Sequence, residues 1–256
     1  MPLRAVTGHR PLIKLLARAV SRGTLPPTLL FAGPEGVGKR TVALALAQAI
    51  NCETPEQTPV SSKGDDRSEF DACGVCQNCE RIERRLHGEV RLVEPNDKGH
   101  ISVDQVREVS RQAQYRPFEG RTRVVILDQA DRLRPEAQSA LLKILEEPPS
   151  ASVIILVSSR PDALFPTVLS RCPRLRFGRL TAAEVAELLV RDHGYGEGDA
   201  HSVAVTADGS LGLALRLDSD DLASARECAS RSLHSSATTT DSKRRLAAIK
   251  ELFKEF

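Results

Sequence analysis

The sequence predicts an α/β protein in which a mostly parallel sheet flanked by helices is followed by a small all-helical part. Up to about residue 178, short apolar runs that fit buried strands alternate with longer stretches of helical periodicity. Such alternation implies βα units with parallel strands. From Thr181 onward the pattern is helical only. With 256 residues, 41% of them hydrophobic, the chain can bury a sizeable core.

The first elements surround a glycine-rich turn. Apolar residues at helical spacing predict a helix over residues 12–20 that ends near Gly23. The apolar run 28–32 predicts a buried strand, and helical periodicity resumes over residues 39–50, after the turn. The polar stretch 53–71 that follows is interpreted as an exposed insertion.

Three further strands and two helices are expected before the last short strand. The strands are predicted over 90–93, 123–127 and 152–157, and the last one over 174–177. Ser102 and Gln105 form a capping-box pattern before a helix that reaches about Gln114. Pro135 opens the second helix, which ends at Glu147 before two prolines.

The remaining residues lack strand patterns. Thr181 and Glu184 form another capping-box pattern, and Gly209-Ser210 separates two short helical segments. A Ser/Thr-rich linker over 232–242 precedes a final amphipathic helix over 244–256. We therefore expect the α/β part to end near residue 178.

The charge balance narrows the classes of function. Lys plus Arg number 36 and Asp plus Glu 34, a formal net charge of +2, and aromatic residues make up only 4% of the chain. This argues against autonomous nucleic-acid binding through a strongly basic face or stacked aromatic side chains. We find no secretory segment, and no apolar run nears the roughly 20 residues of a membrane-spanning helix, so we expect a cytoplasmic protein without a membrane partner.

The glycine-rich turn predicts a phosphate-binding loop. It reads Gly33-Pro-Glu-Gly-Val-Gly-Lys39 and matches the pattern G-x-x-x-x-G-K between a strand and a helix. In such a turn the backbone N–H groups and the helix N-terminus cradle phosphate oxygens, while the lysine reaches the terminal phosphates. The predicted nucleotide-binding residues of the loop and the helix after it are Gly33, Gly36, Gly38, Lys39, Arg40 and Thr41, and Asp128 at the end of a later strand completes the set.

This loop departs from the pattern of an active nucleoside triphosphatase. The residue after Lys39, which should carry a hydroxyl for Mg²⁺, is Arg40, and Thr41 lies about 100° further round the helix. Asp128 ends a strand where the Mg²⁺-associated aspartate is placed, but Gln129 replaces the acid that would activate water. We expect little or no ATP hydrolysis by this chain, whereas binding of ATP with Mg²⁺ and an empty site are both left open.

Four of the six cysteines are clustered and predict a zinc module over about residues 52–80. Three of them follow a C-x-x-C-x-x-C spacing, and Gly74 allows the tight turn that such a site needs. Unligated thiols or disulfides are the alternative interpretation. Four thiolates leave no open coordination position, so the expected Zn²⁺ is structural. The predicted ligands are Cys52, Cys73, Cys76 and Cys79.

Two further motifs complete a pattern that is known from one family. They are Leu-Leu-Lys-Ile-Leu-Glu-Glu-Pro-Pro at residues 141–149 and Ser170-Arg171-Cys172. With the phosphate loop and the cysteine module, they resemble bacterial clamp-loader subunits, AAA+ proteins of the DNA polymerase III holoenzyme. The eroded nucleotide motifs are most similar to the delta prime type. The resemblance covers about residues 5–217.

The resemblance implies the architecture and the roles of individual residues. It implies a P-loop AAA+ core over 1–178 with the inserted zinc module, an all-helical lid over 179–217 and, over 218–256, a partial tail that starts a collar-like region. Arg171 matches the arginine finger that enters the ATP site of the neighbouring subunit. The sensor-1 region contains Ser158 and Ser159, and Gly212 stands where active subunits carry an ATP-sensing arginine.

The favoured hypothesis is therefore a non-hydrolysing subunit that helps load a sliding clamp on primed DNA during replication. Its implied partners are gamma/tau-type and delta-type subunits, the clamp and, through the complex, DNA. An active gamma/tau-type ATPase is one alternative, against which Arg40, Gln129 and Gly212 count. A zinc-containing DNA-binding protein is the other. Its candidate phosphate contacts would be Arg174 and Arg176 on a strand, or Arg81, Arg84 and Arg85 on a helix.

Overall fold

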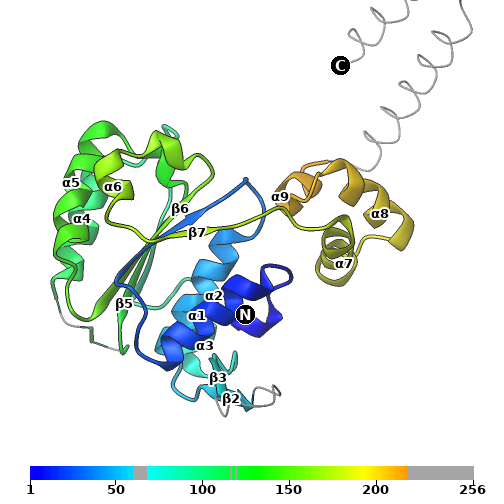
Figure 1. The fold of residues 1–256 in the computed structure, drawn as a ribbon, viewed down its shortest axis with the longest axis horizontal. Helices are drawn as coiled ribbons and strands as arrows, with labels where there is room; N and C mark the ends of the chain where they lie inside the picture. Colours follow the sequence, from blue (N-terminus) through cyan, green and yellow to red (C-terminus); the bar gives the residue numbers. More distant parts are fainter. Residues whose placement is uncertain (60–67, 116, 119, 218–256) are drawn as a thin grey trace, which may run out of the picture.

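The apolar runs form a five-stranded parallel sheet in a computed structural model that describes residues 1–59, 68–115, 117, 118 and 120–217. The strand order is β4-β5-β6-β1-β7 (Figure 1). Every residue of β1 and β6 is buried, as expected for Leu-, Ile- and Val-rich strands covered on both faces. The strands are β1 (Thr28–Ala32), β4 (Val90–Val93), β5 (Arg123–Leu127), β6 (Ser152–Ser158) and β7 (Arg174–Arg176).

Helices cover the two faces of this sheet and make two separate apolar clusters. Leu29 and Phe31 of β1 pack with α1 (Arg10–Ser21) and α2 (Lys39–Asn51). The alternate residue Leu30 packs on the other side. The helices on that side are α4 (Val103–Ala113), α5 (Pro135–Glu146) and α6 (Pro166–Leu169), which Figure 1 shows on the opposite face from α1 and α2. The fold class expected from the sequence is confirmed.

The polar insertion contains a hairpin that the sequence does not predict. Strand β2 (Glu56–Pro59) pairs antiparallel with β3 (Ser68–Asp71), and α3 (Gln77–Glu83) follows. The two strands carry mostly polar residues without the alternation that marks a half-buried strand. The side-chain pattern therefore does not predict the backbone hydrogen bonds that pair these two strands. Residues 60–67 lie outside the described residues.

After β7 the chain forms a small helical part with its own apolar cluster. It contains α7 (Ala182–His193), α8 (Glu197–Thr206) and α9 (Leu211–Ala214). The capping boxes expected at Ser102 and Thr181 are both present. The linker and helix expected over residues 232–256, and Cys228, lie outside the described residues.

Short 3₁₀ turns complete the described chain. They are η1 (Leu3–Ala5), η2 (Ala130–Arg132) and η3 (Pro161–Ala163). Within the described ranges, no helix combines the length and the apolar character needed to cross a membrane.

Candidate nucleotide site and metal centre

A cavity of about 790 Å³ opens where the carboxyl ends of the central strands meet the helical part. The loop after β1 and the segment after β5 contribute to it because parallel strands end at the same edge of a sheet. Residues of α9 and the turn after it close the other side. The predicted nucleotide contacts that line it are Gly36, Gly38, Lys39, Arg40, Thr41 and Asp128. Gly33, the first residue of the loop, does not line the cavity, and a Cβ atom there would clash with the carbonyl oxygen of Phe177.

Lys39 is buried and turned into the phosphate loop. Its Nζ donates hydrogen bonds to the carbonyl oxygens of Gly33, at 2.8 Å, and Pro34, at 2.5 Å. Burial lowers the pKa of Lys39, while the negative charges of Asp128 and Asp131 oppose this shift. The ammonium group is thus held at the position from which a P-loop lysine reaches phosphate.

Arg40 places a guanidinium between two carboxylates. Its NH1 lies 3.2 Å from Oδ2 of Asp128 and 2.5 Å from Oε1 of Glu94, the residue after β4. A Mg²⁺ ion at this site needs the hydroxyl that Arg40 replaces and the carboxylate that Arg40 engages. The residues present therefore do not fit a Mg²⁺ ion held in the way of P-loop nucleotidases. Thr41 is exposed at the rim.

Asp131 holds the residues at the end of β6 in place through its carboxylate. No role was predicted for it from the sequence. Its Oδ1 accepts hydrogen bonds from the Ser158 hydroxyl, at 3.0 Å, and the Ser159 N–H, at 3.1 Å, and Arg160 lies 3.5 Å from Oδ2. Burial acts to raise the pKa of Asp131, but these contacts outweigh it and lower the pKa. The available signal was a second acid three residues after Asp128. Both sensor-1 candidates thus contact one carboxylate.

Gln129 takes a left-handed backbone conformation, with φ 51°, directly after Asp128. Its backbone N–H donates to Oδ1 of Asp128 at 3.0 Å, and its side chain is exposed at the cavity wall. An amide at this position can orient a water molecule but cannot accept its proton. The position therefore lacks a general base.

The helical part is joined directly to the phosphate loop. The Ser210 hydroxyl donates to the carbonyl oxygen of Glu35 at 2.9 Å, and Arg216 lies 2.6 Å from Oε1 of the same residue. The Gly212 N–H donates to the carbonyl oxygen of Gly36 at 3.1 Å. Gly36 has φ +74°. These contacts, which the sequence did not predict, fix the helical part against the loop.

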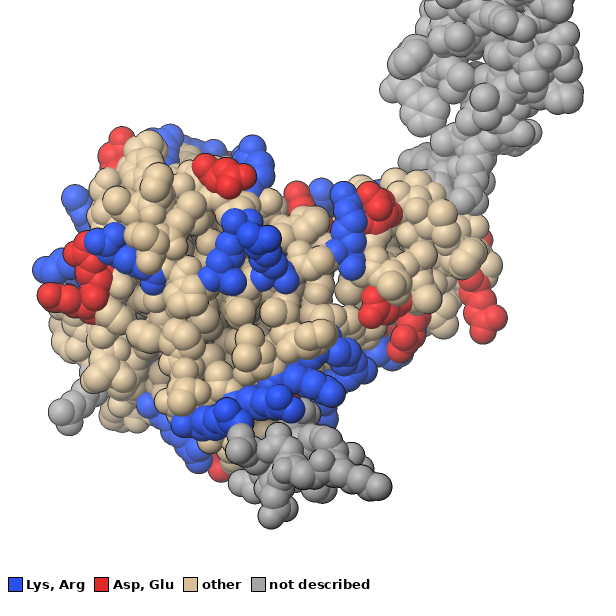
Figure 2. Space-filling model, viewed as in Figure 1, with Lys and Arg blue, Asp and Glu red and all other residues tan. Residues whose placement is uncertain are grey.

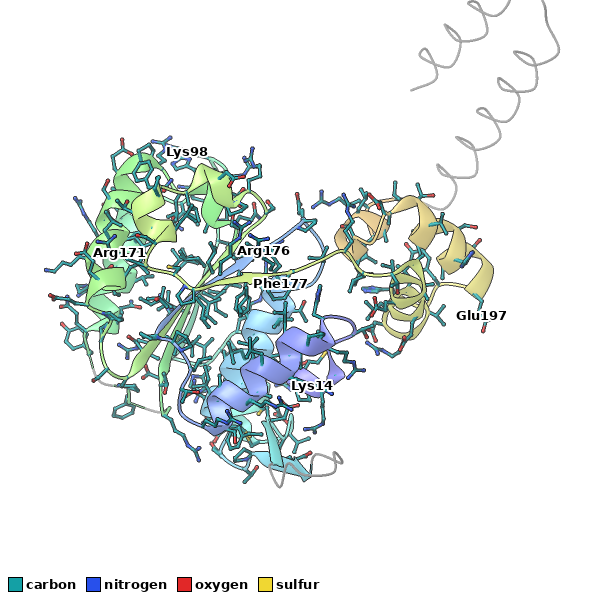
Figure 3. The ribbon with its side chains drawn as sticks, viewed as in Figure 1. Lys14, Lys98, Arg171, Arg176, Phe177 and Glu197 are labelled. Atoms are coloured by element: carbon teal, nitrogen blue, oxygen red, sulfur yellow. The ribbon has the colours of Figure 1, made fainter. Side chains whose placement is uncertain are left out.

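Arg171 lies on a different side of the core from this cavity. It directly follows the C-cap of α6, and Figure 3 shows it beside α5 and α6, away from α7–α9. The guanidinium lies 2.6 Å from Oε1 of Glu146 and donates to the carbonyl oxygen of Thr167 at 2.8 Å. Its side chain is 33% exposed. Arg171 is therefore held at the surface and does not line the cavity of its own chain.

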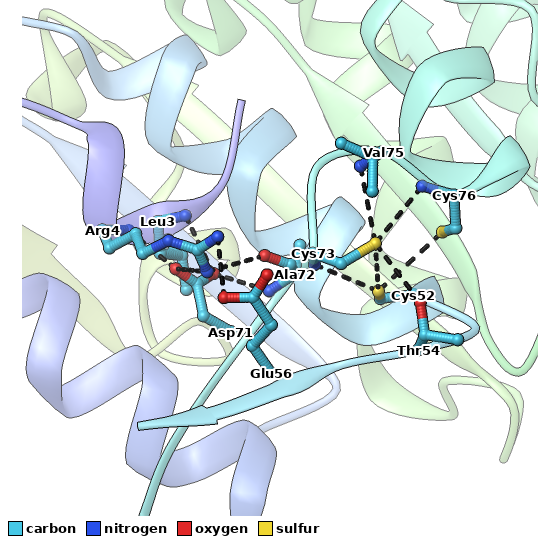
Figure 4. Close-up of polar contacts among 10 residues, drawn as sticks. All are labelled: Leu3, Arg4, Cys52, Thr54, Glu56, Asp71, Ala72, Cys73, Val75 and Cys76. Atoms are coloured by element: carbon cyan, nitrogen blue, oxygen red, sulfur yellow. Dashed lines mark hydrogen bonds and ion pairs between the residues drawn. The ribbon is translucent and has the colours of Figure 1, made fainter. Parts of the chain in front are cut away.

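The four clustered cysteines converge on one point between α2, β3 and α3. Their sulfur atoms all lie within 4.8 Å of one another. The Sγ atom of Cys52 lies 3.6 Å from that of Cys73 and 3.9 Å from that of Cys76 (Figure 4). Four sulfurs at 2.3 Å from a tetrahedral Zn²⁺ would lie about 3.8 Å apart. The donor set and spacing therefore fit a structural zinc ion.

Hydrogen bonds around Cys73 favour its thiolate form. Desolvation acts to raise its pKa, but the Thr54 hydroxyl and the N–H groups of Val75 and Cys76 outweigh it and lower the pKa to about 6. Burial raises the pKa of Cys79. Thiolate is the form that binds zinc, so the backbone around Cys73 is arranged for a metal ligand.

Exposed cations gather in two places on the face drawn in Figure 2. Arg174 and Arg176 lie on one face of the edge strand β7, as expected from their spacing. A longer row follows α1, with a cation at every fourth position. Its members are Arg10, Lys14, Arg18 and Arg22, all exposed. The spacing of this row is visible in the sequence, but no role was expected for it.

Comparison with known proteins identifies the family to which this chain is similar. Residues 8–181 match the family model described as DNA polymerase III, delta subunit. The DNA polymerase III subunit tau of Escherichia coli (strain K12) is 33% identical over 225 residues, which cover 86% of this chain and 33% of that protein. The subunit delta' of Bacillus subtilis (strain 168) is 30% identical over 178 residues, which cover 70% of this chain and 50% of that protein.

Solved structures share the fold at lower sequence identity. The RuvB Holliday junction branch migration motor of Thermotoga maritima has a TM-score of 0.52 and 16% identity, covering 95% of this chain and 69% of that chain. This likeness concerns the AAA+ fold alone. The chain spans about a third of the length of the tau relative. Because the family model covers more than half of the chain, the chain belongs to the family of DNA polymerase III clamp-loader subunits.

Proposed function

We propose that the chain is a delta prime-type subunit of a clamp loader, a cytoplasmic assembly that places a sliding clamp on primed DNA during replication. In this role it hydrolyses little or no ATP itself and donates Arg171 to the ATP site of a neighbouring gamma/tau-type subunit. Gamma/tau-type and delta-type subunits and the clamp are its partners, and DNA is reached through the complex.

The ion pair between Arg40 and Asp128 carries the first half of this proposal. It replaces the Mg²⁺ hydroxyl and occupies the Mg²⁺-associated acid in a single contact. Gln129 supplies no base for the attacking water. Together these features support a subunit that keeps the shape of a nucleotide site without its hydrolytic groups.

The position of Arg171 supports the second half. Its neighbour Cys172 is 3% exposed and anchors the segment, while the guanidinium stays near the surface. A guanidinium supplied to a neighbour's ATP site stabilises charge on the transferring phosphoryl group and is worth about 10³–10⁵ in rate. The ion pair with Glu146 positions this group before it meets a partner.

The cysteine cluster supports a structural role for zinc. Cys52 follows α2, whereas the other three cysteines lie between β3 and the first turns of α3. A zinc ion there would tie the inserted module to the end of the helix that begins at the phosphate loop. It leaves no open coordination position for a reaction.

An active gamma/tau-type ATPase is the second candidate, because the tau relative is as similar to this chain as the delta' relative is. Steady-state ATP turnover by the isolated chain separates the two. We expect turnover no higher than that of the variant Lys39→Ala, which removes the P-loop ammonium. Robust turnover that depends on Lys39 would favour the gamma/tau-type reading and overturn our proposal.

A further inference from the structure

We infer that Arg40 takes the place of a Mg²⁺ ion, so that the cavity binds the phosphates of a nucleotide without a divalent cation. This inference rests on the proposed function only in treating the cavity as this chain's own nucleotide site. The expected ligand of that site is a nucleoside polyphosphate without a bound metal ion.

The guanidinium occupies the region between the two positions that would hold the ion. In P-loop nucleotidases the metal is bound by the hydroxyl after the loop lysine and by the acid that ends the neighbouring strand. Arg40 is the residue at the first position, and its NH1 lies 3.2 Å from the carboxylate at the second, Asp128. A Mg²⁺ ion about 2.1 Å from the same carboxylate would meet a like charge and find no hydroxyl.

A second acid anchors this cation from the next strand. Glu94 follows β4, which pairs with β5, and its Oε1 lies 2.5 Å from NH1 of Arg40. Arg85 contacts the other oxygen of Glu94 at 3.4 Å. The carboxylates after two adjacent strands therefore hold one guanidinium, as they would a metal.

The guanidinium keeps donors for a ligand. An arginine side chain carries five N–H donors, and both printed contacts of Arg40 use NH1. Within the described chain, its Nε and NH2 make no hydrogen bond, and the side chain is 29% exposed at the cavity wall. These donors can bind phosphate oxygens in the fork geometry that suits arginine.

The charges around the cavity favour a ligand that brings no cation. Asp128, Asp131 and Glu35 each contact an arginine that also lines the cavity. Lys39 and Arg132 line it as well, and neither makes an ion pair with a residue that the structure describes. The wall is therefore positive before any ion is added, which suits a polyphosphate anion.

The test is a titration of ATP into the purified chain by calorimetry, once with excess EDTA and once with excess Mg²⁺. We expect the wild type to bind ATP at least as tightly in EDTA as in Mg²⁺, because Mg²⁺ competes with Arg40 for the phosphates. In Arg40→Thr the order should reverse. Losing a charge-assisted hydrogen bond weakens binding in EDTA by about tenfold or more, and the new hydroxyl with a freed Asp128 recovers it in Mg²⁺.

Two variants and a measurement of metal coordination serve as controls for this test. Arg85→Ala removes a contact to Glu94 without touching Asp128, so it should keep the wild-type order. Arg40→Lys keeps a cation and should bind ATP in EDTA more tightly than Arg40→Thr; thermal melting confirms that each variant folds. Electron paramagnetic resonance of Mn²⁺ with ATP should show protein-coordinated metal in Arg40→Thr and not in the wild type.

Two outcomes would overturn the inference: wild-type affinity for ATP that is higher in Mg²⁺ than in EDTA, or no ATP binding by the wild type in EDTA. Neither outcome touches the role of Arg171, which is measured at a partner's site. Conversely, an inert Arg171 would leave the order of affinities in EDTA and Mg²⁺ unchanged.

Discussion

The carbonyl oxygen of Gly36 accepts a hydrogen bond of 3.1 Å from the backbone N–H of Gly212. The two backbones are so close that a Cβ atom on Gly212 would lie 2.8 Å from the Cα of Gly36. This is the position at which the family resemblance expects an ATP-sensing arginine. In this chain it holds the helical part against the phosphate loop, and no side chain fits there without movement.

Gly212→Ala should therefore loosen the contact between α9 and the loop. The added methyl group forces two backbones apart, which typically costs about 1–3 kcal/mol. Urea unfolding measures the loss, and hydrogen exchange of the α9 amides locates it. Gly198→Ala in α8 is the matched control, since a Cβ there meets no atom within 4 Å. It should be neutral or stabilise the helix by up to about 1 kcal/mol, so equal losses in both variants would contradict our account.

Removal of zinc should destabilise the inserted module. Asp71 accepts hydrogen bonds from the N–H groups of Leu3 and Arg4 next to the cysteine cluster (Figure 4). We expect the purified protein to contain zinc, and Cys76→Ser to lose it, with a lower unfolding midpoint and faster hydrogen exchange in the N-terminal residues. Cys172→Ala, which removes a buried thiol outside the cluster, should keep its zinc. A metal-free protein with wild-type stability would refute the structural role.

The carboxylate of Asp131 should make stability fall at acidic pH. Its pKa is lowered in the folded protein, against the effect of burial, by hydrogen bonds from Ser159 and Ser158 and by Arg160. A lowered pKa means that the stabilisation is present above the unfolded pKa, about 4, and is lost as the pH falls through the folded pKa. Urea unfolding at several pH values should show the gap between wild type and Asp131→Asn narrowing below about pH 4. The exposed Asp97→Asn should show no such trend; a gap that stays constant for Asp131→Asn would contradict the prediction.

The ion pair between Arg171 and Glu146 should contribute little to folding. The two side chains are 33% and 49% exposed, and pairs of this kind are worth about 0–1 kcal/mol. We expect Arg171→Ala and Glu146→Gln to unfold within about 1 kcal/mol of the wild type in urea. A larger loss in Arg171→Ala would indicate a structural role and would argue against its use at a partner's site.

The central strands of the sheet, β1, β5 and β6, were predictable because they consist mainly of apolar and β-branched residues. Residues 28–32, 90–93 and 123–127 were expected as strands and are strands with the same bounds. The hairpin of β2 and β3 was not, because polar strands in a small module owe their pairing to backbone hydrogen bonds and neighbouring elements. The periodicity of side chains along the sequence does not predict such pairing.

The catalytic groups that the site lacks were predictable from the sequence, but the contacts that replace them were not. The pattern showed that Arg40 removes a hydroxyl and Gln129 an acid. The destination of the guanidinium depends on Glu94, which lies 54 residues away and reaches Arg40 only because β4 pairs with β5. The contact of Gly212 with Gly36 likewise depends on how the helical part is placed on the core.

This chain is proposed to supply Arg171 to a neighbouring ATP site while its own site hydrolyses little or no ATP. ATP turnover by the assembled clamp loader, with clamp and primed DNA, tests it most directly when wild type is compared with Arg171→Ala and with the exposed control Arg174→Ala. We predict that Arg171→Ala lowers turnover at the neighbouring site by about 10³ or more, that Arg174→Ala keeps it, and that the isolated chain adds none. Unchanged turnover in the Arg171→Ala complex would contradict the claim.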